Sequence, residues 1–203
     1  KLAEYKLKQS NNQLENNLDE MVRAMSLTVE ERDPYTAGHQ RRATELAVAL
    51  AREMGLSNQQ CKSLRMAGLI HDMGKIAIPA EILSKPGGLN NVEFQLIQRH
   101  PQVGYDILKQ FEFPGAVDRI VLQHHERLNG SGYPQGLAGD NILLEARILC
   151  IADVVETIDS HRPYRPGRGL DVALHDFLFL FQFRFQRRFL GLVILLHGVA
   201  KAA

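Results

Sequence analysis

Cysteine is scarce in this sequence, and neither sign of charge predominates. The two cysteines, Cys61 and Cys150, lie in apolar segments with helical spacing, so they exclude a disulfide framework and predict buried free thiols in a reducing cytoplasm. A formal net charge of +1 favours neither a nucleic-acid-binding protein nor a membrane-surface protein. There is no signal peptide and no apolar run long enough to cross a bilayer. Because the sequence begins with Lys1, we expect a fragment that lacks its upstream part.

The composition is typical of a soluble globular protein. Apolar residues make up 45% and charged residues 23% of 203 residues, which allows one domain with a full core and an appendage. Apolar residues recur at helical spacing in five segments: 38–55, 57–76, 90–111, 116–127 and 143–161. No convincing alternating strand pattern precedes residue 177. We therefore expect an all-α helical bundle with extended loops at 77–90 and 128–141.

Residues 1–32 contain neither glycine nor proline and predict a long linker helix. Apolar residues recur at spacings of three and four, as in the seam of a coiled coil, and Asn11 takes one core position. The seam consists of Leu7, Leu14, Leu18, Met21, Met25 and Thr28. A parallel dimeric linker from an upstream domain is the favoured interpretation. A single surface helix and a seam that runs on into the core remain alternatives.

The last segment, 177–203, differs from the rest in composition. It holds six of the nine phenylalanines and four basic residues but no acid. Four phenylalanines from Phe179 to Phe185 alternate with period two, as in a half-buried strand, and a membrane-interface segment is an alternative. The abrupt change after Asp176 resembles a frame shift or truncation. A native tail is the other interpretation.

Histidines and carboxylates in apolar surroundings suggest a metal site. The stretch LIHDMGK places His71, Asp72 and Lys75 in an otherwise apolar segment, where buried charge needs compensation that a divalent cation can supply. Adjacent helical residues are about 100° apart, so His71 and Asp72 can approach one ion from two sides. Lys75 lies one turn beyond His71 and is expected on the same face. Asp153 is a further acid in an apolar helix.

Seven residues are candidate metal ligands: His39, His71, Asp72, His100, His124, His125 and Asp153. Histidines and carboxylates without a thiolate suit iron, manganese or zinc and argue against a structural zinc finger. If Asp72 bridges two ions, each ion receives four protein ligands and keeps open positions. Such a site is expected in a two-metal hydrolase that cleaves a phosphate ester by in-line attack. Scattered surface histidines are the alternative interpretation.

Four stretches occur in order along the chain: RDPYTAGH (32–39), HDMGK (71–75), HHERLNGSGYPQGL (124–137) and ADVVETIDSHRPYR (152–165). Together they resemble the HD-GYP domain, a branch of the HD phosphohydrolase superfamily, over about residues 24–176. The resemblance implies an all-helical catalytic domain at 33–176. It also implies hydrolysis of cyclic di-GMP to the linear dinucleotide pGpG, and in some members on to GMP.

The resemblance also implies roles for individual residues. One ion would be held by His39, His71, Asp72 and Asp153, and the second by Asp72, His100, His124 and His125. The ions are expected to be iron or manganese, with zinc, nickel and magnesium as further candidates. Lys75 would contact the scissile phosphate and, with Asp72, form the catalytic pair. Tyr133, Arg162 and Arg165 would bind the phosphates and guanine bases, for which bidentate arginines are suited.

The expected setting is bacterial two-component signalling in the cytoplasm. Beyond cyclic di-GMP, the expected partners are an upstream sensor or receiver domain and a second copy of the chain, bound through the N-terminal helix. No nucleic-acid polymer and no membrane is expected to bind.

Two departures from the family pattern affect these expectations. Some members hold a third ion with a glutamate four residues before the first histidine, but this position is Tyr35 here. We therefore predict two ions, which favours pGpG as the product. The acid-free tail also replaces the polar helices that usually close the bundle.

Two alternative functions follow. The chain is either a catalytically impaired module that binds a cyclic dinucleotide or a partner protein, or an HD hydrolase acting on another nucleotide. The complete GYP loop argues against the second.

The remaining polar residues have less specific interpretations. Glu126 either orients a ligand or ends a helix in solvent. Asp33 can cap the helix that begins near His39, and Arg41 and Arg42 are assigned to a solvated helix face.

Overall fold

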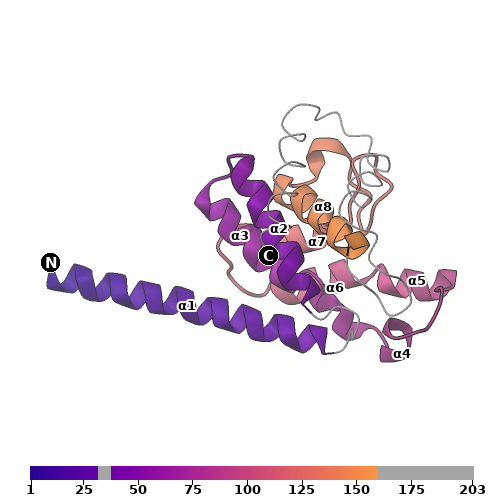
Figure 1. Ribbon diagram of the computed structural model, residues 1–203, viewed down its shortest axis with the longest axis horizontal. Coiled ribbons are helices and arrows are strands. Elements are labelled where there is room, and N and C mark those ends of the chain that lie inside the picture. Colours follow the sequence, from indigo (N-terminus) through magenta and orange to yellow (C-terminus); the bar gives the residue numbers. More distant parts are fainter. Residues whose placement is uncertain (32–37, 160–203) are drawn as a thin grey trace.

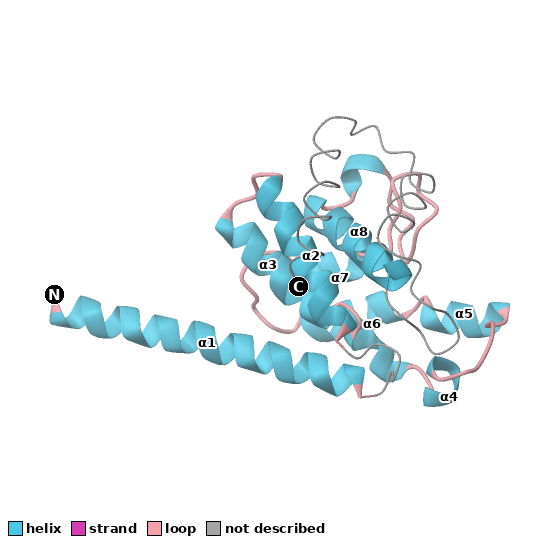
Figure 2. Ribbon diagram, viewed as in Figure 1, coloured by secondary structure: helices cyan, strands magenta, loops and turns pink. Residues whose placement is uncertain are grey.

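The computed structural model describes residues 1–31 and 38–159, and these form helices joined by loops (Figure 1; Figure 2). The α-helices are α1 (Leu2–Glu30), α2 (His39–Glu53), α3 (Asn58–Ile70), α4 (Ala80–Leu83), α5 (Asn91–Ile97), α6 (His100–Leu108), α7 (Val117–Gln123) and α8 (Leu144–Asp159). Two 3₁₀ helices are η1 (Met73–Ala77) and η2 (Gly139–Asn141). Within the described ranges there is no strand, only one isolated bridge between Asn129 and Ala138. The all-α expectation is confirmed.

The core lies where α2, α3, α7 and α8 pack together. Helix α2 lies against both α3 and α8, while α6 lies against η1 and α7. The largest fully buried apolar side chains come from several of these helices, and they include Leu64, Ile70, Ile120, Ile148 and Leu149. Burying each such side chain stabilises the fold by about 1.5–3 kcal/mol relative to leaving it exposed. The two cysteines are buried and unpaired with each other, as predicted.

Side-chain caps mark the starts of α3 and α5, but the helix predicted over 57–76 ends early. Ser57 caps α3 by accepting a hydrogen bond from the Gln60 N–H at 3.3 Å. The helix predicted over 57–76 is wrong beyond Ile70, because His71 is the C-cap and Met73–Ala77 winds as a tighter 3₁₀ helix. Lys75 therefore does not share a continuous helix face with His71.

The segment 90–111 forms two separate helices, α5 and α6, and Pro101 lies in the first turn of the second, where its missing N–H leaves no hydrogen bond unmade. The two predicted loops contain short helical elements. The predicted loop at 77–90 contains the short helix α4, and that at 128–141 contains η2.

A close crossing of η1 and α6 brings the HDMGK stretch to His100. A methyl group added at Gly74 would overlap the main-chain carbonyl of His100, and one at Gly104 would lie 3.0 Å from a methyl of Val121. Only glycine permits this approach of two backbones. The crossing is thus what places Asp72 and Lys75 beside the first residue of α6.

Helix α1 presents two different faces. Val22, Ser26 and Val29 are buried against the helical body, where α1 lies against α3 and η1. Of the predicted seam, Leu7, Leu14 and Met21 are each 63% exposed, and the N-terminal half of α1 projects beyond the body (Figure 1). The seam therefore does not run on into the core, apart from the half-buried Leu18.

Among the described residues, three polar contacts connect α1 to the body. Asp19 pairs with Arg65 of α3 at 3.0 Å, and the buried Ser26 hydroxyl donates to the Gln40 side-chain oxygen at 2.6 Å. The Glu30 carboxylate accepts from the Gly38 N–H at 3.0 Å. Two of these three contacts are made at the start of α2, the helix on which His39 lies.

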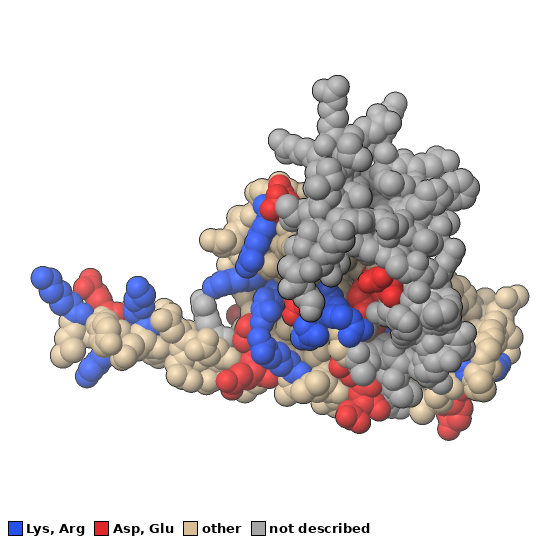
Figure 3. Space-filling view, viewed as in Figure 1, with Lys and Arg blue, Asp and Glu red and all other residues tan. Residues whose placement is uncertain are grey.

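Within the described residues, none of the helices combines the length and apolar character needed to span a membrane. On the face of the molecule shown in Figure 3, basic and acidic side chains are interspersed along α1 and over the visible part of the body.

The close approach of η1 and α6 at Gly74 predicts that even one added methyl group destabilises the fold. Gly74→Ala must push η1 away from α6, because backbone atoms cannot yield as a flexible side chain can. We expect the free energy of unfolding, measured by chemical denaturation, to fall by about 1–3 kcal/mol. Gly88→Ala is the control, since a methyl group there meets nothing within 4 Å. Equal stability of the two variants would show that the crossing is not constrained.

Candidate metal centre

All seven predicted metal ligands come together in the described structure. They are supplied by the start of α2 (His39), the turn between α3 and η1 (His71, Asp72), the start of α6 (His100), the end of α7 (His124, His125) and the middle of α8 (Asp153). His71 and His100 are 1% exposed and His124 is fully buried. Side chains from segments more than 110 residues apart therefore meet inside the molecule, which excludes the interpretation as scattered surface histidines.

The ligands form two neighbouring groups with a third between them. One group is His39, His71 and Asp153, the other is His100, His124 and His125, and the connecting group is His71, Asp72 and His124. Within each group the candidate ligand atoms lie within 4.8 Å of one another. His39 Nε2 lies 3.0 Å from Asp153 Oδ1, and His71 Nε2 lies 4.0 Å from the same oxygen.

Asp72 lies between the two groups and directs one oxygen to each. Its Oδ2 is 3.6 Å from His71 Nε2, and its Oδ1 is 3.4 Å from His100 Nε2. Lys75 Nζ lies 2.8 Å from Oδ2. Burial alone would raise the pKa of this carboxyl, but the charge of Lys75, with smaller contributions from the neighbouring histidines, outweighs burial and holds the pKa well below its usual value. Asp72 is therefore an ionised carboxylate with the geometry of a bridging ligand.

Hydrogen bonds fix the orientation of three histidine rings. In each, Nδ1 donates to the carbonyl three residues earlier: His71 to Gly68 at 2.7 Å, His100 to Ile97 at 2.7 Å, and His124 to Val121 at 2.6 Å. A carbonyl can only accept, so the proton is on Nδ1, and the neutral form of each ring has its lone pair on Nε2. All three Nε2 atoms therefore point into the centre as acceptors.

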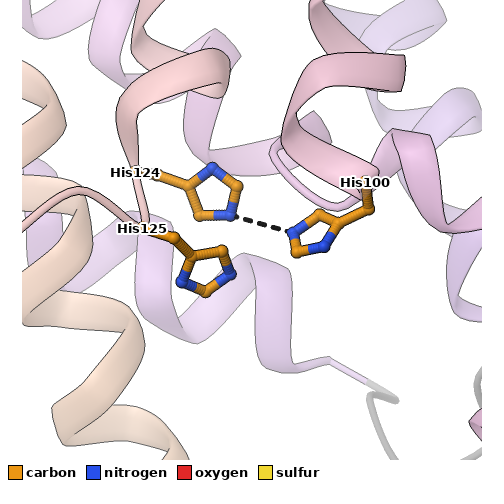
Figure 4. A group of neighbouring side chains, drawn as sticks. All are labelled: His100, His124 and His125. Carbon is orange, nitrogen blue, oxygen red and sulfur yellow. Dashed lines mark hydrogen bonds between the residues drawn. The ribbon is translucent and has the colours of Figure 1, made fainter. Parts of the chain in front are cut away.

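The same hydrogen bonds give a test of whether the site fits a cation. His100 Nε2 and His124 Nε2 face each other at 3.3 Å (Figure 4). Two lone pairs cannot form a hydrogen bond with one another, whereas a cation held by both removes the repulsion. Nitrogen and carboxylate oxygen are donors that iron, manganese and zinc accept. The residues present therefore fit a divalent transition-metal ion.

Burial keeps the second group of histidines neutral. It lowers the pKa of His100 to about 4 and that of His125 to about 3, and it also lowers the pKa of His124. Neighbouring histidines contribute to each shift. Neutral rings are the form that binds metal, so no proton has to leave these residues near neutral pH.

His39 has different surroundings, and they include a residue that the sequence did not reveal. Its Nδ1 contacts Glu156 Oε2, while its Nε2 faces Asp153. Burial would lower the pKa of His39, but the hydrogen bonds to Asp153 and Glu156 outweigh it and raise the pKa to about 10. Glu156 in turn accepts from Arg42 Nε at 2.7 Å, and the Arg42 side chain is itself 43% exposed, as expected for a solvated helix face. Glu156 lies one turn after Asp153, and this i, i+3 spacing of two acids in an apolar helix was the available signal.

Glu126 anchors the glycine-rich loop and is not a solvated helix end. Its buried carboxylate accepts from the Gln135 N–H at 2.7 Å and from the Leu137 N–H at 2.9 Å. Gly132 packs so closely on the backbone of Glu126 that a methyl group there would overlap it. The loop is thereby folded back, and the Tyr133 ring lies 4.8 Å from the His125 ring, measured between ring centroids.

A pocket of about 330 Å³ opens onto the centre. Its lining includes Asp72, Lys75, His125, Arg127, Tyr133 and Asp153. Arg127 was not predicted as a site residue; its Nη1 lies 2.6 Å from Cys150 Sγ. Burial raises the pKa of that thiol to about 12, so Cys150 stays protonated and offers no thiolate ligand. Tyr35, Arg162 and Arg165 lie outside the described residues.

Comparison with known proteins identifies the family. The HD domain family model matches residues 23–178, which is most of the chain. The chain belongs to the HD domain family. The resemblance predicted from the four sequence stretches is thereby confirmed. Nothing in this match tests the individual site residues, whose roles stay predictions.

Several curated relatives of this HD domain chain are named as phosphodiesterases. The cyclic di-GMP phosphodiesterase response regulator RpfG of Xanthomonas campestris is 41% identical over 173 residues, covering 84% of this chain and 46% of RpfG. The cyclic di-GMP phosphodiesterase PA4108 of Pseudomonas aeruginosa is 44% identical over 136 residues, covering 66% of this chain and 33% of the relative. The 3'3'-cGAMP-specific phosphodiesterase 1 of Vibrio cholerae is 40% identical over 151 residues, covering 74% and 35%. The chain thus spans less than half the length of these relatives.

A solved structure supports the HD fold. The PgpH HD domain of L. monocytogenes, solved in complex with cyclic-di-AMP, has a TM-score of 0.58 and 21% identity. The match covers 87% of this chain and 96% of that one. At this identity the likeness shows the fold alone.

Replacing Glu126 should loosen the glycine-rich loop locally. In Glu126→Ala, two part-buried N–H groups lose a charged acceptor, and a hydrogen bond to a charged group contributes about 1.5–3 kcal/mol. We expect faster hydrogen exchange at the Gln135 and Leu137 amides while both metal ions stay bound. The exposed Glu112→Ala is the control. If exchange at these amides is unchanged, or if metal is lost instead, Glu126 acts on the ligands rather than on the loop.

Proposed function

We propose that this chain is the catalytic part of a metal-dependent phosphodiesterase that hydrolyses cyclic di-GMP to pGpG. The observation that carries the proposal is the ionised Asp72 carboxylate, which directs its two oxygens to two histidine groups at the base of an open pocket. The names of the curated relatives supply the reaction and the substrate class. We assign iron or manganese to both groups, from the nitrogen and oxygen donors and the absence of a thiolate.

The ligand assignment follows the geometry. His39, His71, Asp72 and Asp153 hold one ion, and Asp72, His100, His124 and His125 hold the other. When bound, the pair of ions lowers the pKa of water and polarises the phosphate. The chain's own part is to keep Asp72 ionised and to present unprotonated Nε2 atoms.

Lys75 and Tyr133 both line the pocket and act on the substrate. The Lys75 ammonium, 2.8 Å from Asp72, is placed to neutralise a non-bridging oxygen of the phosphate that is cleaved. Burial raises the pKa of Tyr133, so its hydroxyl stays protonated and can donate to a phosphate oxygen. Arg162 and Arg165 complete the substrate set as predictions, since they lie outside the described residues.

A second cyclic dinucleotide deserves the same test. The relative from Vibrio cholerae described above is named as specific for 3'3'-cGAMP, and it is nearly as similar to this chain as the cyclic di-GMP enzymes are. The two substrates differ in one base. We commit to cyclic di-GMP and treat 3'3'-cGAMP as the competitor.

We also propose an upstream receiver domain, a homodimer and a cytoplasmic setting for this chain. RpfG is named as a response regulator, which supports a receiver domain upstream of this segment in a two-component pathway. The exposed seam on α1, with Asn11 at a core position, supports a parallel homodimer of the linker helix. Two free thiols support a reducing cytoplasm as the site of the reaction.

Hydrolysis of the proposed substrate is the direct test. Protein loaded with Mn²⁺, or with Fe²⁺ under anaerobic conditions, is incubated with cyclic di-GMP or 3'3'-cGAMP, and the products are separated by chromatography. We expect pGpG from cyclic di-GMP and a lower rate with 3'3'-cGAMP. Lys75→Ala is expected to lower kcat by about 10²–10³-fold.

Asp72→Ala is expected to lose both ions, because this carboxylate is the shared ligand. Asp106→Ala, which removes an exposed carboxylate on α6 paired with Lys109, should keep both. Two bound ions without turnover of either dinucleotide would reject the enzyme and leave the metal assignment intact.

The dimer has its own test. Leu14→Glu places a charge in the exposed seam without touching the body, so it should convert a dimer to a folded monomer in sedimentation equilibrium. Asn12→Glu, exposed but off the seam, is the control. A monomeric wild-type chain would contradict the proposal.

A further inference from the structure

The four histidines with described Nδ1 contacts are not held in the same way. Those of His71, His100 and His124 donate to neutral backbone carbonyls. That of His39 contacts the carboxylate of Glu156 instead. His39 is the first residue of α2, so its ring is oriented by a side chain from another helix, α8.

Glu156 belongs to a set of four residues on two adjacent helices. His39 and Arg42 are one turn apart on α2, and Asp153 and Glu156 are one turn apart on α8. Arg42 donates from Nε at 2.7 Å and from Nη2 at 2.6 Å to Glu156 Oε1, while Glu156 Oε2 faces His39. The guanidinium compensates the charge of a carboxylate that is only 7% exposed, and it fixes which oxygen is presented to His39.

A carboxylate behind a metal-binding histidine has two effects. Once an ion displaces the proton from Nε2, the carboxylate holds the remaining proton on Nδ1, so that Nε2 faces the metal with its lone pair and is a stronger donor. The group of His39, His71 and Asp153 has this support and a carboxylate ligand of its own. The group of His100, His124 and His125 has neutral rings and only its share of Asp72. In a low-dielectric interior, the additional negative charge favours a divalent cation in the first group.

We propose that Glu156 is a positioning residue that gives the ion at His39, His71, Asp72 and Asp153 the higher affinity, so that the two sites fill in order. The inference rests on the proposed metal-dependent function and deepens it. It assigns to Glu156 and Arg42 the task of preparing one ligand for one ion, and it leaves the second ion as the one that exchanges more readily.

Stepwise Mn²⁺ binding to the metal-free chain tests this inference. We expect wild type to bind two ions in two resolved steps in isothermal titration calorimetry. In Glu156→Gln the single amide oxygen cannot serve both Arg42 and His39, and the amide N–H₂ favours the wrong tautomer of His39. The tight step should weaken by about 10–100-fold, the usual effect of losing such a partner. The weaker step should keep its affinity.

Two further variants separate positioning from a structural role. Glu145→Gln makes the same substitution elsewhere on α8, at a glutamate that accepts a hydrogen bond from Gln60 of α3 at 3.0 Å. It should leave both steps unchanged. Glu156→Asp keeps the charge but withdraws it by one methylene, so its tight step should weaken less than that of Glu156→Gln. Circular dichroism of each metal-free variant shows whether it is folded. If one of the two Glu156 variants does not fold, the other still tests the inference.

The outcomes distinguish this inference from the function on which it rests. One affinity for both ions in wild type, or equal weakening of both steps in either Glu156 variant, overturns the ordered filling. No bound metal in wild type overturns both the inference and the metal-dependent function. Two ordered steps with the expected loss, but no hydrolysis of cyclic dinucleotides, would sustain the role of Glu156 and reject the phosphodiesterase.

Discussion

The burial of an ionised Asp72 among inward-facing histidine nitrogens is the constraint on which the site depends. A carboxylate that is almost fully enclosed needs positive charge nearby, and Lys75 supplies only one unit of it at 2.8 Å. The facing lone pairs of His100 and His124 add to the same demand. Without a cation, the buried carboxylate and the facing lone pairs would destabilise the folded chain. Metal binding explains why the fold contains them.

The surrounding fold serves to satisfy this constraint. The Gly74 crossing brings Asp72 to α6, and the packing of α2 on α8 brings His39 to Asp153 and Glu156. Glu126 folds the glycine-rich loop over His125. Helix α1 reaches the same centre from outside, because it is bonded to the residues on both sides of His39, Gly38 and Gln40. A change in the position of α1 would therefore act directly on the residues next to His39, the ligand that Glu156 contacts.

The sequence predicted the helical fold, and the seven candidate ligands that it indicated do lie together, because adjacent histidines, HDMGK and a buried aspartate are local signals that stay readable without coordinates. Local reasoning failed where the outcome depended on a distant segment. The helix at 57–76 stops at Ile70 because Gly74 must meet α6, which propensity cannot reveal. Glu156 and Arg42 look like ordinary polar positions until α2 and α8 are packed together. Glu126 could be weighed but not decided, since its partners lie 9 and 11 residues further along the chain.

We propose that Asp72 joins two ions into one centre. Anomalous diffraction from crystals of the Mn²⁺-loaded chain can test this proposal, because it locates each ion independently of its ligands. Two peaks about 3.5–4 Å apart are expected, one on either side of the Asp72 carboxylate. A single peak, or two peaks separated so widely that one carboxylate cannot reach both, would contradict it.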